Sequence, residues 1–306
     1  MPRLISTLGP IGPERAGIVL PHEHIFVDLR TPETPGHAEA GTEDVVEAMT
    51  PLLEEAREAG IGAIAEASCV GVGRRADVLR AVSEAAAMPL LAPTGIYREP
   101  WIPRWAHDES EDGLFDWMVS ELIDGIEQSG VRAGWIKLSA GDDGLTPCES
   151  KVFRAAVRAG MEAGATVGSH TLRGRVVLEQ LRILDSLGLD PGRFIWIHAH
   201  VEEDFSLNLE VARRGAWIEY DAIGSPGSDA LAVERVLRLL DADLGKRVLL
   251  SQDRGWFDPG KPKGGEKKPY AYLVKEFIPK LRAAGVGDGM VGALTRENPF
   301  RAFARD

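Results

Sequence analysis

The segment 16–24 reads Ala16-Gly17-Ile18-Val19-Leu20-Pro21-His22-Glu23-His24, an apolar run that ends in two histidines. The run has the composition of a buried β-strand. Alternate residues of a strand point to the same face, so His22 and His24 would aim two imidazoles at one point, as a metal site requires. The same short motif also fits two unrelated polar residues leaving a strand, so the rest of the chain has to separate these interpretations.

Seven further segments resemble this apolar run. The eight strand candidates are 16–22, 62–69, 90–97, 133–139, 165–170, 194–200, 216–223 and 247–252. Most are rich in Val, Ile, Ala or Trp, as strands buried on both faces should be. Amphipathic stretches alternate with them and predict helices at 43–60, 74–88, 112–130, 147–164, 172–188, 204–215, 228–245 and 270–285. Pro51 and Pro279 predict a kink or a late start in two of these helices.

This alternation predicts an α/β fold. Eight β-then-α units in about 270 residues are typical of a closed (β/α)8 barrel, here a single domain over residues 1–306. A doubly wound open sheet is the alternative. Against it, no Gly-x-Gly-x-x-Gly follows an early strand, and Gly71-Val72-Gly73 lacks the third glycine. Long loops are expected at 98–111, after strand three, and at 258–269, after strand eight.

The composition excludes several classes of protein. A net charge of -12 disfavours binding to nucleic acid or to an anionic membrane surface. We find no signal peptide and no apolar stretch of about 18 residues, so no membrane-spanning helix is expected. The only cysteines, Cys69 and Cys148, cannot form a disulfide framework, and the cytoplasm is the simplest compartment.

In a (β/α)8 barrel, catalytic groups lie at the C-terminal ends of the strands. Five of the seven histidines fall at predicted strand ends: His22, His24, His170, His198 and His200. The other two, His37 and His107, lie in predicted loops. This concentration indicates a metal-binding site at one end of the barrel.

Two further polar residues occupy the same ends. Lys137 lies inside the apolar fourth strand, where a charged amine is costly unless it is paired or neutralised. The alternative is that it reaches out of the barrel to water or to a carboxylate. Asp253 follows strand eight in Ser251-Gln252-Asp253, and its alternative role is a helix N-cap or a loop turn.

Taken together, these motifs resemble the phosphotriesterase family of the amidohydrolase superfamily. The residues that carry the similarity are His22-Glu23-His24, Lys137, Ser169-His170-Thr171, Ile197-His198, Ser251-Gln252-Asp253 and Thr295-Arg296-Glu297-Asn298-Pro299. The pattern is closer to the phosphotriesterase-like lactonases than to the organophosphate hydrolases. The resemblance covers nearly the whole chain, and the order of its ligand motifs is specific.

The resemblance implies a binuclear metal centre. His22, His24 and Asp253 would hold the more buried ion, and His170 and His198 the more exposed one. Lys137, carboxylated on its amine, would bridge both together with a hydroxide. His200 is the alternative to His198, because both lie on the same face of the strand; we prefer His198 because its spacing from Arg214-Gly215 fits the family pattern. Nitrogen and oxygen ligands suit zinc first, with Co, Mn, Fe or Ni as alternatives.

The resemblance also implies a mechanism. The bridging hydroxide would attack a carbonyl carbon or a phosphorus, and Asp253 would accept the proton and pass it to the leaving group. Tyr97, at the end of strand three, would lie beside the metals and orient a lactone. The alternative for Tyr97 is a rim residue that packs a loop.

Substrate contacts are expected from Asp221, Arg254, Trp256 and Phe257. Acyl-homoserine-lactone members of the family usually have an arginine next to this aspartate, where this chain has Ala222, which argues against those substrates. The lysines of the loop after strand eight, Lys261, Lys263, Lys267 and Lys268, either attract an anionic substrate such as a phosphorylated sugar lactone or belong to a solvated loop.

The sequence therefore predicts a metal-dependent lactonase with promiscuous organophosphate triesterase activity on small-molecule substrates. A true phosphotriesterase or carboxylesterase is one alternative, and a non-catalytic binding barrel is another. The intact ligand set argues against the binding barrel. A homodimer is expected from the family, with Trp101 and Trp105 as candidate interface or lid residues.

Overall fold

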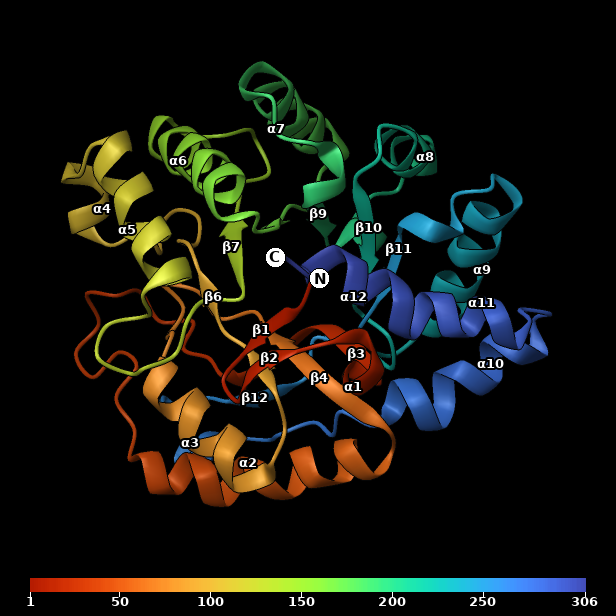
Figure 1. The fold of residues 1–306 in the computed structure, drawn as a ribbon, viewed down its shortest axis with the longest axis horizontal. Helices are drawn as coiled ribbons and strands as arrows, with labels where there is room; N and C mark the ends of the chain where they lie inside the picture. The colour runs from red at the N-terminus through yellow and green to blue at the C-terminus, as the bar shows by residue number, and fades with distance from the viewer.

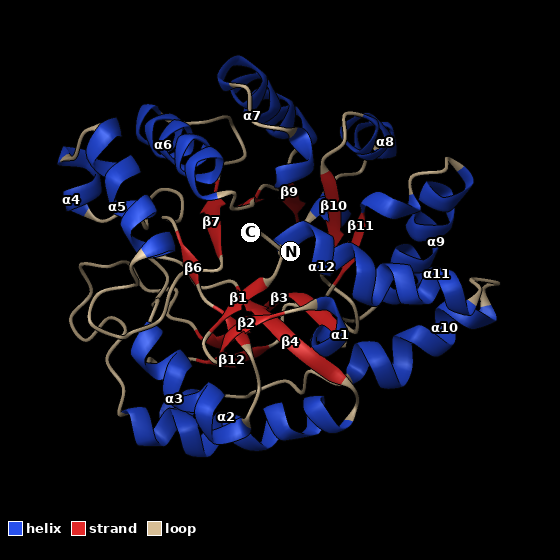
Figure 2. Cartoon of the chain, in the orientation of Figure 1, coloured by secondary structure: helices blue, strands red, loops and turns tan.

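A computed structural model describes all residues, 1–306, as a ring of strands inside a ring of helices (Figures 1 and 2). The strands are β1 (Leu4–Ser6), β2 (Gly9–Ile11), β3 (Ile18–Phe26), β4 (Ile61–Glu66), β5 (Leu90–Leu91), β6 (Pro93–Thr94), β7 (Trp135–Ser139), β8 (Val167–His170), β9 (Phe194–Ile197), β10 (Trp217–Tyr220), β11 (Val248–Leu250) and β12 (Gly255–Phe257). The α-helices are α1 (Pro13–Ala16), α2 (Thr42–Glu58), α3 (Ala76–Ala86), α4 (Arg104–Asp108), α5 (Glu111–Ile123), α6 (Pro147–Ala163), α7 (Gly174–Leu187), α8 (Phe205–Arg213), α9 (Ser228–Asp241), α10 (Ile278–Ala283), α11 (Asp288–Gly292) and α12 (Asn298–Phe303).

The ring is built from two parallel sheets. Their strand orders are β11-β10-β9-β8-β7-β6 and β12-β3-β4-β5. The sheets join at β5 and β6, which are consecutive pieces of one extended segment. At the other join, between β11 and β3, the Asp253 N–H donates to the His22 carbonyl at 3.2 Å and the Ser251 hydroxyl donates to the same oxygen at 3.0 Å. These bonds close a (β/α)8 barrel, as predicted, and exclude the open doubly wound sheet.

The barrel strands alternate between two cores. In β9, Ile195 and Ile197 pack inside the ring, whereas Phe194 and Trp196 pack outward against the helices. This is the period-two pattern of a strand buried on both faces. Trp135 also packs inside the ring, so Lys137, two residues further along β7, points into the barrel interior.

The floor of the barrel comes from both ends of the chain. Leu4 and Ile11 of the β1–β2 hairpin pack with Phe303 against the inner core. Both termini accordingly lie near the centre of the ring in Figure 1. The sequence analysis did not predict this hairpin, β12 or the helices after residue 285. Strands of only three residues are too short to show a recognisable hydrophobic periodicity.

Several helix boundaries differ from the predictions. The helix predicted at 112–130 ends at Ile123, and a turn with Gly125 at φ 138° leads the chain back to β7. The helix predicted at 270–285 starts with a wide turn, η5 (Leu273–Phe277), and continues as α10 with Pro279 in its first turn. Helix α2 runs through Pro51 from Thr42 to Glu58. No helix has both the length and the apolar character that crossing a lipid bilayer demands.

Replacing Arg305 by alanine should destabilise the protein by about 2–4 kcal/mol. The buried guanidinium donates to the carbonyls of Leu122 (2.7 Å), Ala133 (2.9 Å) and Ala163 (3.1 Å), which would lose their partner. Arg282→Ala, which removes an exposed pair with Asp288, serves as the control and should cost less than about 1 kcal/mol. Urea unfolding of both variants checks this, and equal losses would contradict the anchoring role.

Candidate metal centre

Four histidines converge at the C-terminal end of the barrel. The ring centroids of His22 and His198 lie 5.0 Å apart, and those of His170 and His198 lie 4.3 Å apart. Each ring has its Nδ1 within hydrogen-bond distance of an oxygen: His22 with Glu219 (2.9 Å), His24 with Ser68 (2.8 Å), His198 with Asp221 (2.8 Å) and His170 with Tyr97 (3.2 Å). A partner on Nδ1 fixes the ring orientation and leaves Nε2 free for a ligand.

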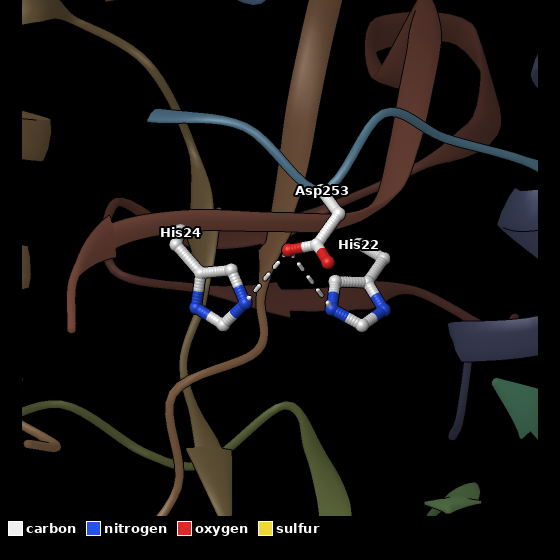
Figure 3. A group of neighbouring side chains, drawn as sticks. All are labelled: His22, His24 and Asp253. Atoms are coloured by element: carbon white, nitrogen blue, oxygen red, sulfur yellow. Dashed lines mark ion pairs between the residues drawn. The ribbon is translucent and has the colours of Figure 1, made fainter. Parts of the chain in front are cut away.

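Asp253 faces two of these rings, as Figure 3 shows. Its Oδ1 lies 3.1 Å from the Nε2 of His24 and 3.8 Å from the Nε2 of His22. The donor atoms of the three residues all lie within 4.8 Å of one another. Asp253 and His198 both adopt a left-handed backbone, with φ 52° and 63°. This conformation is uncommon for non-glycine residues and is held in place here by the surrounding structure.

Lys137 lies in the same cavity without a partner. Its side chain is buried, and the structure contains no hydrogen bond or ion pair from its amine. Burial lowers the pKa of this amine. The alternative in which the lysine reaches a carboxylate is therefore not what the structure contains. A buried amine biased toward its neutral form is the state that carboxylation requires.

The donor set fits divalent cations. The Nε2 of His170 is buried and has no hydrogen-bond partner, although nearly all buried polar atoms of folded proteins are paired. The donors around the cavity are imidazole nitrogens, a carboxylate and an amine, without a thiolate ligand. Zinc and its first-row neighbours prefer such ligands.

The two histidines of β3 differ in their electrostatics. Burial lowers the pKa of His22 to about 4, so its ring is neutral at pH 7. Burial acts in the same direction on His24, but the hydrogen bonds with Asp253 and Glu66 outweigh it and raise its pKa to about 9. A cation bound between His24 and Asp253 takes the place of that proton, because metal ligation requires neutral imidazole.

A second layer of carboxylates supports the rings. Asp221 Oδ1 lies 2.8 Å from the Nδ1 of His198 and 3.1 Å from the Nδ1 of His200, and its Oδ2 lies 3.3 Å from the Nδ1 of His22. Burial raises the pKa of Glu219 well above its usual range, whereas the histidines keep the pKa of Asp221 low despite its burial. Asp221 was predicted to contact substrate; its side chain is buried against the histidines, and it also lines the outer pocket.

Glu219 and Ser68 were not singled out from the sequence. The signal for Glu219 was available, since it precedes Asp221 by two residues in a buried strand and therefore shares its inward face. Ser68 gave no signal, because a serine after a strand is common.

His198 lines the inner cavity, whereas His200 does not, although its ring lies 5.9 Å from that of His198. The His200 side chain is 20% exposed and lines the outer pocket. Tyr97 lines the inner cavity with its hydroxyl next to His170, and Trp101 packs edge-on against its ring. Trp256 lines both the cavity and the outer pocket, with its ring 5.0 Å from that of His24.

Two predicted substrate contacts lie elsewhere. The Arg254 guanidinium donates to the carbonyls of Gly224 (2.8 Å) and Pro269 (3.3 Å), so it ties two loops together. Phe257 is buried, stacks on Phe26 and lines a separate groove. The sequence could not reveal where these two side chains point, because both residues follow Asp253 at the turn into β12.

Comparison with known proteins assigns the family. The profile of the phosphotriesterase family matches residues 2–303. The chain belongs to the phosphotriesterase family. Membership makes this protein a hydrolase of the ester or phosphoester type.

Three relatives illustrate its position within the phosphotriesterase family. The chain is 28% identical to a phosphotriesterase homology protein of Mycobacterium tuberculosis, over 100% of this chain and 98% of that protein. It is 27% identical to an aryldialkylphosphatase of Saccharolobus solfataricus, over 94% and 95% of the two chains. A crystal structure of a mutant PTE-like lactonase from Deinococcus radiodurans superposes with a TM-score of 0.87, at 30% identity, over 98% and 99% of the two chains.

Asp221→Ala should lower the bound metal per chain and reduce kcat/KM by about 10- to 100-fold, the usual effect of removing a partner of metal-binding histidines. The ring of His198 would lose its hydrogen-bond acceptor, and the ring of His22 would lose a carboxylate 3.3 Å from its Nδ1. Asp143→Ala, at a fully exposed side chain, should leave both quantities unchanged. Elemental analysis together with steady-state kinetics measures them, and full metal content in Asp221→Ala would contradict the supporting role.

Proposed function

We propose that this protein is a metal-dependent lactonase with a slower organophosphate triesterase activity. One observation carries the proposal: all six predicted ligands line one cavity of about 160 Å³, together with Tyr97 and Trp256. The PTE-like lactonase from Deinococcus supports the lactonase assignment. The aryldialkylphosphatase relative favours the alternative, a true phosphotriesterase or a carboxylesterase.

We assign the ligands as the family resemblance implies. His22, His24 and Asp253 would hold one ion, His170 and His198 would hold the other, and carboxylated Lys137 would be a ligand of both. Zinc is the first choice and Co, Mn, Fe or Ni are alternatives. When bound, two divalent ions supply an activated water and polarise the carbonyl or phosphoryl oxygen of the substrate.

The protein's own side chains position the substrate and transfer the proton. Asp253 lies at the boundary between the cavity and the outer pocket, with 27% of its side chain exposed, and serves as the proton acceptor. Asp221 and Glu219 keep the histidine rings in place. The Tyr97 hydroxyl next to His170 orients the lactone, and Trp256 forms the wall on the His24 side.

The outer pocket favours a polar substrate. It has a volume of about 400 Å³ and opens above His198 and Asp253. Ala222 and Trp256 are its only hydrophobic lining residues, so a long acyl chain would find little apolar surface there. Asp258 and Glu266 line this pocket together with Lys261 and Lys268. Lys261 is paired with Asp258 at 3.2 Å, whereas Lys268 has no ion-pair partner and is the cation available to an anionic group. The proposed substrate is therefore a lactone with a polar or anionic substituent.

We also propose a compartment and an oligomeric state for the enzyme. Both cysteines are free thiols, which supports a reducing cytoplasm. Trp105, with 44% of its surface exposed, supports a homodimer interface at α4.

A substrate panel tests the lactonase proposal. Metal-replete protein is assayed on acyl-homoserine, aliphatic γ- and δ-, and phosphorylated sugar lactones, and on an aryl dialkyl phosphate. The highest kcat/KM is expected on a polar or phosphorylated lactone. A higher value on the phosphate triester would favour the true phosphotriesterase instead.

Asp253→Asn and Lys137→Met should each lower kcat by at least about 10³-fold, since the first removes the proton acceptor and the second removes the bridging ligand. Wild-type protein should contain two ions per chain, and removing them with a chelator should abolish turnover. Activity that survives in Asp253→Asn, with well under two ions per chain in metal-supplemented wild type, would overturn the hydrolase mechanism.

Lys268→Ala should raise KM for an anionic lactone by up to about fivefold and leave KM for a neutral lactone unchanged, because an exposed charge pair is worth at most about 1 kcal/mol. Lys268 lines the outer pocket, whereas Lys263 of the same loop lines only the neighbouring groove. Lys263→Ala is thus the matched control. Equal shifts in both variants would mean that the loop acts through its overall charge and not through contact.

A further inference from the structure

We propose that Glu99, His107 and Cys148 form a third metal site, separate from the binuclear centre, which takes a zinc-like divalent ion. The three side chains come from the segment after β6, from α4 and from the first turn of α6. Their donor atoms all lie within 4.8 Å of one another. None of them lines the cavity that holds the six proposed ligands.

The donor types and their spacing favour a metal over an ion pair. Thiolate, imidazole and carboxylate are the three ligand types of protein zinc sites. The Nε2 of His107 lies 3.4 Å from the Oε1 of Glu99. This is longer than the roughly 2.7–2.9 Å of a charge-assisted hydrogen bond. It matches the edge of about 3.3–3.6 Å that a tetrahedron with zinc bond lengths of about 2.0–2.3 Å requires.

The surrounding structure holds the three ligands near one another. The Lys151 ammonium donates to the carbonyls of Ala106 (3.0 Å), His107 (2.9 Å) and Glu109 (2.5 Å), which fixes α4 against α6. The Glu99 N–H donates to Glu149 at 3.2 Å, and Glu149 is itself part of the capping box of α6. An incoming ion would therefore need to order little of the backbone that carries its ligands.

Accessibility and charge also suit the site. The side chains of His107 and Glu99 are 42% and 34% exposed, so an ion can enter from solvent and keep a water as its fourth ligand. Burial raises the pKa of the free Cys148 thiol, so the ion would have to displace its proton; Glu99 and the resulting thiolate would then balance the charge of a divalent cation. Lys151 is the opposing positive charge, and its ammonium is engaged with three carbonyls.

Binding of this ion would restrain one wall of the proposed binuclear centre. Glu99 follows Tyr97 by two residues, and Trp101 packs edge-on against Tyr97 at a centroid distance of 5.6 Å. An ion held by Glu99, His107 and Cys148 would join this segment to α6. The third site thus fixes the position of Tyr97 without taking part in the chemistry.

Cobalt titrated into the metal-loaded enzyme tests the site. A thiolate ligand gives cobalt(II) a sulfur-to-metal charge-transfer absorption in the near ultraviolet, and the binuclear centre has no cysteine ligand that could produce it. The wild type should develop this absorption and bind one ion beyond the binuclear pair. Cys148→Ser and His107→Ala should each lose both the extra ion and the absorption, while both keep the two original ions.

Cys69→Ser is the matched control, because the only other thiol is fully buried. It should retain the absorption. Absorption that is missing in the wild type, persists in Cys148→Ser or disappears in Cys69→Ser would overturn the proposal. His107→Ala keeps the test decisive should Cys148→Ser fail to fold. Hydrolytic activity is not a readout, so failure of the lactonase proposal leaves the third site untouched, and the reverse also holds.

Discussion

Asp221 accepts a hydrogen bond from the ring of His198 and also lies close to the ring of His22, the proposed ligands of two different ions. One of its oxygens faces the Nδ1 of His198, and the other lies close to the Nδ1 of His22. A buried carboxylate is costly unless its hydrogen-bonding capacity is satisfied, and these imidazoles satisfy it. The same contacts turn each Nε2 toward the cavity. The geometry of the metal site therefore depends on the burial of one aspartate, which lies below the reacting groups and not beside them.

The side chains that point into the barrel change from large aromatic rings to polar groups along β7 and β10. Trp135 is followed at the next inward position by Lys137, and Trp217 by Glu219 and then Asp221. The indole rings need space that small residues provide: a Cβ on Gly168 would lie 2.7 Å from the ring of Trp135. A layer of large apolar rings thus packs against a layer of polar side chains. Burial in the polar layer shifts the pKa values of His22, Lys137 and Glu219.

Periodicity was enough to predict the barrel, because strands buried on both faces leave a strong apolar signal. Strand ends brought seven polar candidates together, and the family resemblance was needed to select six of them as ligands and to prefer His198 over His200. The residues that hold the histidine rings in place were harder to predict from the sequence. Ser68 and Glu219 act through contacts between strands that are far apart in sequence. Arg254 and Phe257 were expected in the substrate pocket, but the turn after Asp253 sends both side chains elsewhere. A turn of this kind depends on backbone angles, such as the φ of 52° at Asp253, which no apolar pattern encodes.

The join between β11 and β3 contains few backbone bonds and is closed mainly by Ser251, Glu23 and the segment that leads to Asp253. Ser251 and His22 are 229 residues apart in sequence. An ion held by His22 and His24 on one side and by Asp253 on the other would therefore link the first strand of the barrel to the segment after its last strand. Because the unfolded chain does not hold these ligands together, such an ion would stabilise the folded state by the free energy of its binding. The metal that serves the reaction would then also hold the ring shut, so a cell that starves this enzyme of metal weakens its fold and its chemistry at the same place.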